Sequence, residues 1–460
     1  MRMGRALILA IIVVSSFFAA AFLWRLKPPA HLQDIRVDCE TVIGRIRSLQ
    51  GMNCGPLEVG GRIDLSGRYI ELGVNHVRTH DFYGPGDIDG IFPDFNADPA
   101  LLSNYDFEKT DFLIEGIKDI GADVIFRLGY SWAKPSASIT HVNAADRERW
   151  AEICRHVVMH YNEGWADGYC HNITYWEIWN EPDIDQFWTG TPEEFYDLYE
   201  VTAKALKDYD PSLKIGGPGI AYNLGFADGF IEFCGNRRIP LDFFSWHIYQ
   251  GDAQNPHRVC DRAKRIRELL DVHGFHSAES LLTEWNIAAG GFHREWWNVK
   301  GVAYAASFLM YMQETDIEIA NRYRGDSHVM GLFNGFGSAR KPFYAFKAFK
   351  MLLETPDRLD CVGSDESGYA VMAGKSDDGK VITILISDFS SGHDGYRIEV
   401  GTLPWGNRPF RCERYLLEQF LFIPYNLKLV ESTDQSGDHF LTIEKMNAPS
   451  VQLIRLSVIE

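Results

Sequence analysis

The sequence predicts a (β/α)8 barrel of the TIM type, followed by a smaller antiparallel β-sandwich. From about residue 35 to 350, short apolar runs alternate with amphipathic helical patterns, and after about residue 355 only strand-like runs remain. Eight such runs over about 300 residues give about 40 residues per βα unit, as in a barrel with enlarged loops. A doubly wound open sheet is disfavoured, because no glycine-rich phosphate-binding turn follows the first run.

The predicted barrel spans 45–352, and its strands are apolar as expected for strands buried on both faces. The predicted strands are 49–54, 76–80, 122–128, 174–180, 213–216, 242–247, 280–285 and 328–334. Helices are predicted at 107–120, 144–162, 257–272, 298–313 and 341–354. A further helix begins at Thr191, because Thr191-Pro192-Glu193-Glu194 combines a cap, a proline at the first helical position and a capping box.

Residues 355–460 form the predicted sandwich, and the strand-like stretch 35–43 is expected to pair with it. Its strands are predicted at 381–389, 396–400, 440–444 and 450–458. The chain has 8 cysteines, and Cys361 and Cys412 are a possible disulfide within this region. No CxxC pair is present, so a structural zinc site is not expected.

Residues 1–30 are predicted to be a signal anchor or a cleaved signal peptide. Residues 6–24 are uninterruptedly apolar or small, and as a helix they would extend about 28 Å, just enough to span a bilayer. Basic residues on both sides leave the orientation open. We therefore expect a membrane-anchored protein with an exported catalytic domain, or a secreted one.

The composition narrows the classes of partner. The net charge of −18 argues against nucleic acid and against a polyanionic substrate, and a neutral carbohydrate fits best. Aromatic residues make up 13% of the chain, and their flat faces suit sugar rings. No cofactor and no metal are expected, and the sequence does not indicate the oligomeric state.

Two glutamates stand at the ends of predicted barrel strands, where barrel enzymes carry their catalytic groups. Glu181 lies in WEIWNEPD (176–183) after the fourth run, and Glu284 lies in LLTEWN (281–286) at the end of the seventh. Glycosidic bond cleavage needs a proton donor and a second carboxylate on the opposite face of the sugar. The spacing places the pair three βα units apart, so both can face one bond across the barrel mouth.

These two motifs, with RTHD (78–81), SWHIY (245–249) and ARKPFYAFKAF (339–349), resemble glycoside hydrolase family 39 of clan A. That family includes β-xylosidases, α-L-iduronidases and some bacterial exopolysaccharide hydrolases. The resemblance implies a (β/α)8 fold and retaining double displacement, with Glu181 as acid/base and Glu284 as nucleophile. It also implies that Asn180 binds the sugar 2-hydroxyl and that His247 and Tyr249 line the −1 subsite.

One motif departs from the family pattern, which often has His-Gly where this chain has His80-Asp81. His80 is expected to contact substrate, although a structural histidine, or a metal site with His247 and Asp81, is an alternative.

Aromatic side chains on the predicted loops could form platforms for sugars. The expected platforms are Trp132, Trp188 and Trp285, with Trp296 and Trp297 as further candidates. The alternatives to a family 39 hydrolase are another clan A endo-glycosidase, such as a β-glucanase or β-mannanase, and a carbohydrate-binding barrel without turnover.

Overall fold

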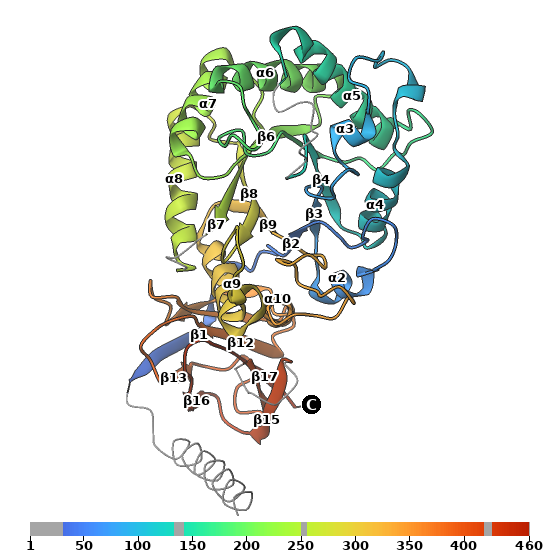
Figure 1. Ribbon diagram of the computed structural model, residues 1–460. Helices are drawn as coiled ribbons and strands as arrows, with labels where there is room; N and C mark the ends of the chain where they lie inside the picture. Colours follow the sequence, from blue (N-terminus) through green and yellow to red (C-terminus); the bar gives the residue numbers. More distant parts are fainter. Residues whose placement is uncertain (1–30, 133–141, 250–254, 418–425, 460) are drawn as a thin grey trace, which may run out of the picture.

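The computed structural model describes residues 31–132, 142–249, 255–417 and 426–459. A closed barrel of eight parallel strands is ringed by helices, and a nine-stranded sheet packs against one side of it (Figure 1). The prediction of a (β/α)8 barrel with a C-terminal β domain is confirmed. The predicted segment 1–30 lies outside the described residues, and within them no helix is long and apolar enough to cross a membrane.

The barrel strands and the helices between them follow one another along the chain. The strands are β2 (Gly51–Asn53), β3 (His76–Arg78), β4 (Asp123–Leu128), β5 (Tyr175–Ile178), β6 (Lys214–Ile220), β7 (Phe243–Tyr249), β8 (Glu279–Asn286) and β9 (Ile317–Arg322). The α-helices are α2 (Ser66–Leu72), α3 (Ile88–Ile91), α4 (Glu108–Asp119), α5 (Arg147–Glu163), α6 (Pro192–Tyr209), α7 (Leu224–Arg237), α8 (Arg258–Val272), α9 (Val299–Tyr311) and α10 (Phe343–Leu353). Helix α6 begins as predicted: Thr191 and Glu194 form the reciprocal capping box.

The eighth strand was predicted in the wrong place. Residues 328–334 form a loop, and the barrel closes through β9, whose Ile317 and Ile319 are buried on either side of an exposed Glu318. Met330, Leu332 and Phe333 of this loop are buried, which explains the error. The guanidinium of Arg340 donates hydrogen bonds to the carbonyl groups of His328, Val329 and Gly331, so these groups have no strand partner but are still satisfied.

The barrel interior is apolar at the N-terminal ends of the strands and polar toward their C-terminal ends. Ile125, Phe243, Leu281 and Ile319 form the apolar layer, which closes that end of the barrel. Because side chains alternate along a strand, the next inward positions lie one layer closer to the C-terminal ends. These positions hold polar and charged side chains, so the barrel interior itself leads to the site.

The β domain is a single curled sheet of nine strands rather than the purely antiparallel sandwich that was predicted. Its strands are β1 (Leu32–Arg45), β10 (Asp357–Val362), β11 (Tyr369–Lys375), β12 (Val381–Asp388), β13 (Gly395–Val400), β14 (Phe410–Leu417), β15 (Lys428–Gln435), β16 (Phe440–Lys445) and β17 (Ser450–Val458). The order is β15-β14-β17-β12-β11-β10-β1-β13-β16. Strand β1, from before the barrel, lies between β10 and β13 and runs parallel to β13, which makes the sheet mixed.

The sheet curls until strands near its two ends share one core. Phe410 of β14 meets Phe440 of β16 with ring centroids 6.4 Å apart. Cys361 and Cys412 both border this core, yet neither is in a disulfide. They lie on β10 and β14, which three other strands separate in the sheet, so the possible Cys361–Cys412 bridge is not formed.

The outer face of the curled sheet packs on α9 and α10 of the barrel. At the centre of this contact, the Ser307 hydroxyl donates to the carbonyl of Gly368, and the Ser387 hydroxyl donates to the carbonyl of Ala303. These groups are buried and paired, which is how polar groups are accommodated in a dry interface. The β domain therefore supports the helices behind β8 and β9.

Candidate active site

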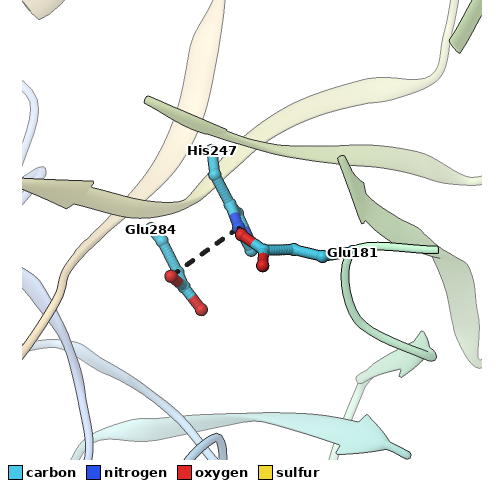
Figure 2. Close-up of side chains that lie close together, drawn as sticks. All are labelled: Glu181, His247 and Glu284. Carbon is cyan, nitrogen blue, oxygen red and sulfur yellow. Dashed lines mark hydrogen bonds and ion pairs between the residues drawn. The ribbon is translucent and has the colours of Figure 1, made fainter. Parts of the chain in front are cut away.

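Glu181 follows β5 at the barrel mouth, where the backbone turns sharply. Trp179 and Glu181 have φ values of 74° and 46°, in the left-handed region that residues other than glycine rarely adopt. Backbone hydrogen bonds hold the turn, because the Trp179 amide donates to the carbonyl of Leu128 and the Glu181 amide to that of Gly219. The turn directs the Glu181 side chain toward the side chains of β7 and β8 (Figure 2).

Glu284 lies at a bulge in β8. Between two successive residues of β7, the pairing jumps from Leu282 to Glu284, so that Thr283 is an extra residue. A bulge of this kind re-aims the side chain next to it. The Thr283 hydroxyl donates to Glu177 inside the barrel, and Glu284 also faces inward although it is the next residue. The bulge is therefore what points Glu284 into the mouth.

The side chains of His247 on β7, Glu284 on β8 and Glu181 in the turn after β5 converge on one point (Figure 2). One atom from each, a carboxylate oxygen or a ring nitrogen, lies within 4.8 Å of the other two. Nδ1 of His247 is 2.7 Å from Oε1 of Glu181 and 3.6 Å from Oε2 of Glu284. The two glutamates predicted from the sequence thus share one site, and both are buried.

A buried arginine that the sequence reasoning missed organises this pair. The Arg78 guanidinium donates to Glu177 over 2.5 Å, to Glu284 over 2.8 Å and to Oδ1 of Asn180 over 2.7 Å. With its Oδ1 held in this way, Asn180 has a buried Nδ2 without a hydrogen-bond partner. The signal was available in the sequence: an arginine inside an apolar barrel strand needs buried carboxylates to pair with it.

The two glutamates have unequal electrostatic surroundings. Burial raises the pKa of both, but Arg78 and the Tyr249 hydroxyl, which donates to Glu284 over 2.5 Å, oppose this at Glu284 and hold its pKa to about 7. The pKa of Glu181 is raised well above its usual value by burial and by the charge of Glu284. The site therefore favours a proton on Glu181 and a negative charge on Glu284.

His80 and Asp81 lie on the other side of Glu284. Nε2 of His80 is 3.5 Å from Glu284 and 3.4 Å from Asp81. Asp81 also accepts hydrogen bonds from the Tyr323 hydroxyl and from the Trp132 amide. Nδ1 of His80 is buried without a partner. Burial lowers the pKa of His80 well below its usual value, so the imidazole is neutral.

Within the described residues, the side chains that could together hold a metal ion are Glu181, His247 and Glu284. The positive charge of the guanidinium 2.8 Å from Glu284 disfavours a cation there. Among the described residues, His80 and Asp81 do not form such a group with His247, so the alternative metal set has no geometric support.

The expected aromatic platforms differ in accessibility. Trp132 is 45% exposed, and its ring meets Phe187 edge to face at 5.5 Å. Trp188 is only 3% exposed, because it packs against Trp179 and Phe195 and donates its Nε1–H to the Thr191 carbonyl. Trp132 remains a candidate platform, whereas Trp188 is part of the core and presents no face to a sugar.

Trp285 is also buried, and its alternating position on β8 explains why. It points away from the barrel axis and stacks on Phe308 of α9 and Phe346 of α10, so it supports Glu284 from behind rather than contacting substrate. Trp296 is buried, with its Nε1–H donated to the Ala288 carbonyl. Trp297 is partly exposed, and the guanidinium of Arg340 lies over its ring, 5.0 Å from the ring centroid.

A barrel with two inward-facing glutamates at the C-terminal ends of β5 and β8 is the arrangement expected of a two-carboxylate glycosidase. The glycosyl hydrolases family 39 model matches residues 62–345. The chain therefore belongs to glycosyl hydrolase family 39.

Curated relatives and solved structures agree with this family. The chain is 25% identical over 269 residues to a β-xylosidase of Geobacillus stearothermophilus, covering 52% of each protein. It is 29% identical over 242 residues to a β-xylosidase of Caldicellulosiruptor saccharolyticus, covering 47% of this chain and 46% of the relative. The chain thus matches about half the length of these relatives.

Solved structures resemble the chain over more than nine-tenths of its length, and two examples follow. A glucosidase from Croceicoccus marinus superposes with a TM-score of 0.80 at 26% identity, covering 94% of this chain and 100% of that one. A monomeric β-xylosidase from Caulobacter crescentus CB15 has a TM-score of 0.72 at 17% identity, covering 93% and 100%. The second likeness concerns the fold alone.

Proposed function

We propose that the protein is a retaining glycoside hydrolase that cleaves O-glycosidic bonds of an oligo- or polysaccharide by double displacement. The observation that carries the proposal is the pair of glutamate oxygens within 4.8 Å of each other. Retaining enzymes hold their carboxyl groups about 5–5.5 Å apart, whereas inverting enzymes leave about 6.5–9.5 Å for a water molecule. The short separation favours direct attack by one glutamate.

The unequal surroundings of the two glutamates support their proposed roles. Glu284, held as a carboxylate by Arg78 and Tyr249, attacks the anomeric carbon. Glu181 gives its proton to the leaving oxygen as the glycosidic bond breaks. In the second step, the Glu181 carboxylate takes a proton from water, the hydroxide attacks the anomeric carbon, and the bond to Glu284 breaks.

Unpaired polar atoms around the pair support binding of a sugar. Nδ2 of Asn180, Nδ1 of His80 and Nε2 of His247 are buried without hydrogen-bond partners. Buried polar atoms without partners are costly, and sugar hydroxyls would satisfy them. We propose a neutral glycoside as substrate, in keeping with relatives named as β-xylosidases and a structural neighbour named as a glucosidase.

Product stereochemistry tests the proposal. The protein should be incubated with a panel of neutral aryl glycosides and oligosaccharides, and the first product anomer followed by NMR. We expect the anomeric configuration of the substrate to be retained. An inverted first product would contradict double displacement, and binding of oligosaccharides without any turnover would support the carbohydrate-binding alternative.

Variants of Glu181 test the acid/base role separately. Glu181→Gln should slow substrates with poor leaving groups far more than activated aryl glycosides, because only the former need the proton. Azide should restore activity on the activated substrates by replacing the water that Glu181 activates. An equal loss on both kinds of substrate would argue against this role. The leaving-group dependence also separates Glu181 from a residue that only binds the sugar.

We also propose that the catalytic body is exported and either anchored in a membrane or secreted. The support is the apolar run 6–24, flanked by basic residues. Cell fractionation with protease treatment of intact cells tests this, since a protected cytoplasmic enzyme would contradict it.

A further inference from the structure

Asp81 is a buried carboxylate beside the nucleophile that the proposed reaction does not use. It is only 1% exposed and has a φ of 63°, a conformation that favours glycine. Its Oδ1 accepts from the Trp132 amide over 2.6 Å, and its Oδ2 accepts from the Tyr323 hydroxyl. Asp81 therefore joins the loops that follow β3, β4 and β9 around one negative charge.

Among the described residues, no cation pairs with Asp81 alone. The closest guanidinium is that of Arg324, 3.9 Å from Oδ2. Arg324 already donates to Asp326 from both Nε and Nη2, and its Nη2 also donates to the backbone carbonyl of Asp81. One guanidinium is thus matched by two carboxylates. Burial raises the pKa of Asp81 above its usual value, and Arg324 and the hydrogen bonds from Tyr323 and Trp132 oppose this rise and favour the charged form.

One guanidinium is also matched by two carboxylates on the other side of the nucleophile. Arg78 is matched by both Glu177 and Glu284. A third guanidinium, that of Arg127, pairs with the single carboxylate of Asp87. Among the described residues around Glu284, the carboxylates therefore outnumber the guanidinium groups that pair with them.

The imidazoles do not correct this excess of negative charge. Burial lowers the pKa of both His80 and His247 well below the usual value. A negative site favours the positive charge that develops on the sugar ring in an oxocarbenium-like transition state. The same site repels a carboxylate carried by the sugar, and the guanidinium groups of Arg78, Arg127 and Arg324 are already paired with carboxylates.

We propose that Asp81 is a specificity-determining residue that makes the site select an uncharged sugar and reject a uronic acid. The inference rests on the proposed glycosidase function. Coulomb's law, with an effective dielectric constant of about 20 and about 8 Å between charges, gives discrimination of about 30-fold from one carboxylate.

The test compares three aryl glycosides with the same ring hydroxyl configuration: 4-nitrophenyl β-D-xyloside, β-D-glucoside and β-D-glucuronide. The wild type should have a higher kcat/KM for the better neutral substrate than for the glucuronide. Asp81→Asn should lower this ratio about 30-fold, because asparagine tolerates the left-handed backbone and keeps an acceptor for Trp132 but carries no charge. Asp326→Asn, a second variant in the same cluster, should shift the ratio in the same direction.

The matched control is Asp123→Asn, which removes one negative charge at the opposite end of the barrel, where the side chain is 70% exposed. It should leave the ratio unchanged. Two results would overturn the role of Asp81 but not the proposed function. The first is a wild type that prefers the glucuronide; the second is a wild type that hydrolyses neutral glycosides while the kcat/KM ratio is unaltered in both Asp81→Asn and Asp326→Asn. A wild type that hydrolyses none of the glycosides in the wider neutral panel would overturn the proposed function and this inference with it.

Discussion

The hydroxyl of Tyr249 offers a quantitative test of how Glu284, the proposed nucleophile, is kept ionised. It donates to Oε2 of Glu284 over 2.5 Å, and Tyr249→Phe removes this bond while keeping the ring. A hydrogen bond to a charged group contributes about 1.5–3 kcal/mol. Since one pH unit corresponds to about 1.4 kcal/mol, the pKa of Glu284 should rise by about one to two pH units in the variant.

The direction of the effect on activity follows from the reactive form. In the proposed reaction Glu284 attacks as a carboxylate, so activity should be lost as the pH falls through its pKa, which is about 7 in the wild type. In Tyr249→Phe this acid limb moves to higher pH. The variant should therefore lose most activity in mild acid and least on the alkaline side, up to the limb set by Glu181.

The assay is kcat/KM against pH for an activated aryl glycoside, measured on both sides of neutrality. Tyr323→Phe is the matched control, because it removes a hydroxyl that is bonded to Asp81 and not to Glu284. Its acid limb should move much less. The reasoning is refuted if the acid limb of Tyr249→Phe stays in place or moves to lower pH.

Three further predictions concern stability and binding. At pH values above the usual pKa of a glutamate, Glu181→Gln should raise the melting temperature, because burial raises the pKa of Glu181 and the folded state disfavours its ionised form. This gain should vanish in acid, where Glu181 is protonated in the unfolded chain too. Arg78→Leu should lower the free energy of unfolding by about 3–5 kcal/mol at neutral pH, because it leaves two buried carboxylates unpaired. Thermal unfolding in acid should show a smaller loss, because the two carboxylates are then protonated. Trp132→Ala should raise KM for oligosaccharides without changing the melting temperature, whereas Trp188→Ala should lower the melting temperature through a cavity of a kind that costs about 3–5 kcal/mol; equal melting temperatures would contradict the core assignment of Trp188.

The sequence was sufficient for the barrel and for the two glutamates, for a physical reason. Parallel barrel strands are short and apolar on both faces, so a glutamate at the end of such a run stands out. The separation of Glu181 and Glu284 then places them on strands that face each other across the mouth. Neither step needs knowledge of side-chain contacts.

What the sequence did not reveal depends on contacts between distant strands. Arg78 is recognisable as unusual within its strand, but its partners Glu177 and Asn180 lie about a hundred positions further on. The bulge at Thr283 exists only relative to β7. Without the structure, Trp285 beside Glu284 looked like a site residue, although the alternation of the strand turns it toward α9 and α10.

The eighth strand shows a different limit. The run 328–334 and β9 have similar apolar content, and only closure of the barrel selects β9, which pairs with both β8 and β2. The curled sheet is similar, because insertion of β1 between β10 and β13 is a pairing over more than 300 residues. Local periodicity predicts strands but does not determine such long-range neighbours.

The most direct test of the account is covalent trapping of the proposed nucleophile. A 2-deoxy-2-fluoro glycoside with a good leaving group, matched to the best neutral substrate, should inactivate the enzyme, and peptide mass spectrometry should find one fluorosugar on the peptide that contains LLTEWN, at Glu284. A label on another residue would contradict the central claim that Glu284 attacks the sugar while Glu181 supplies the proton.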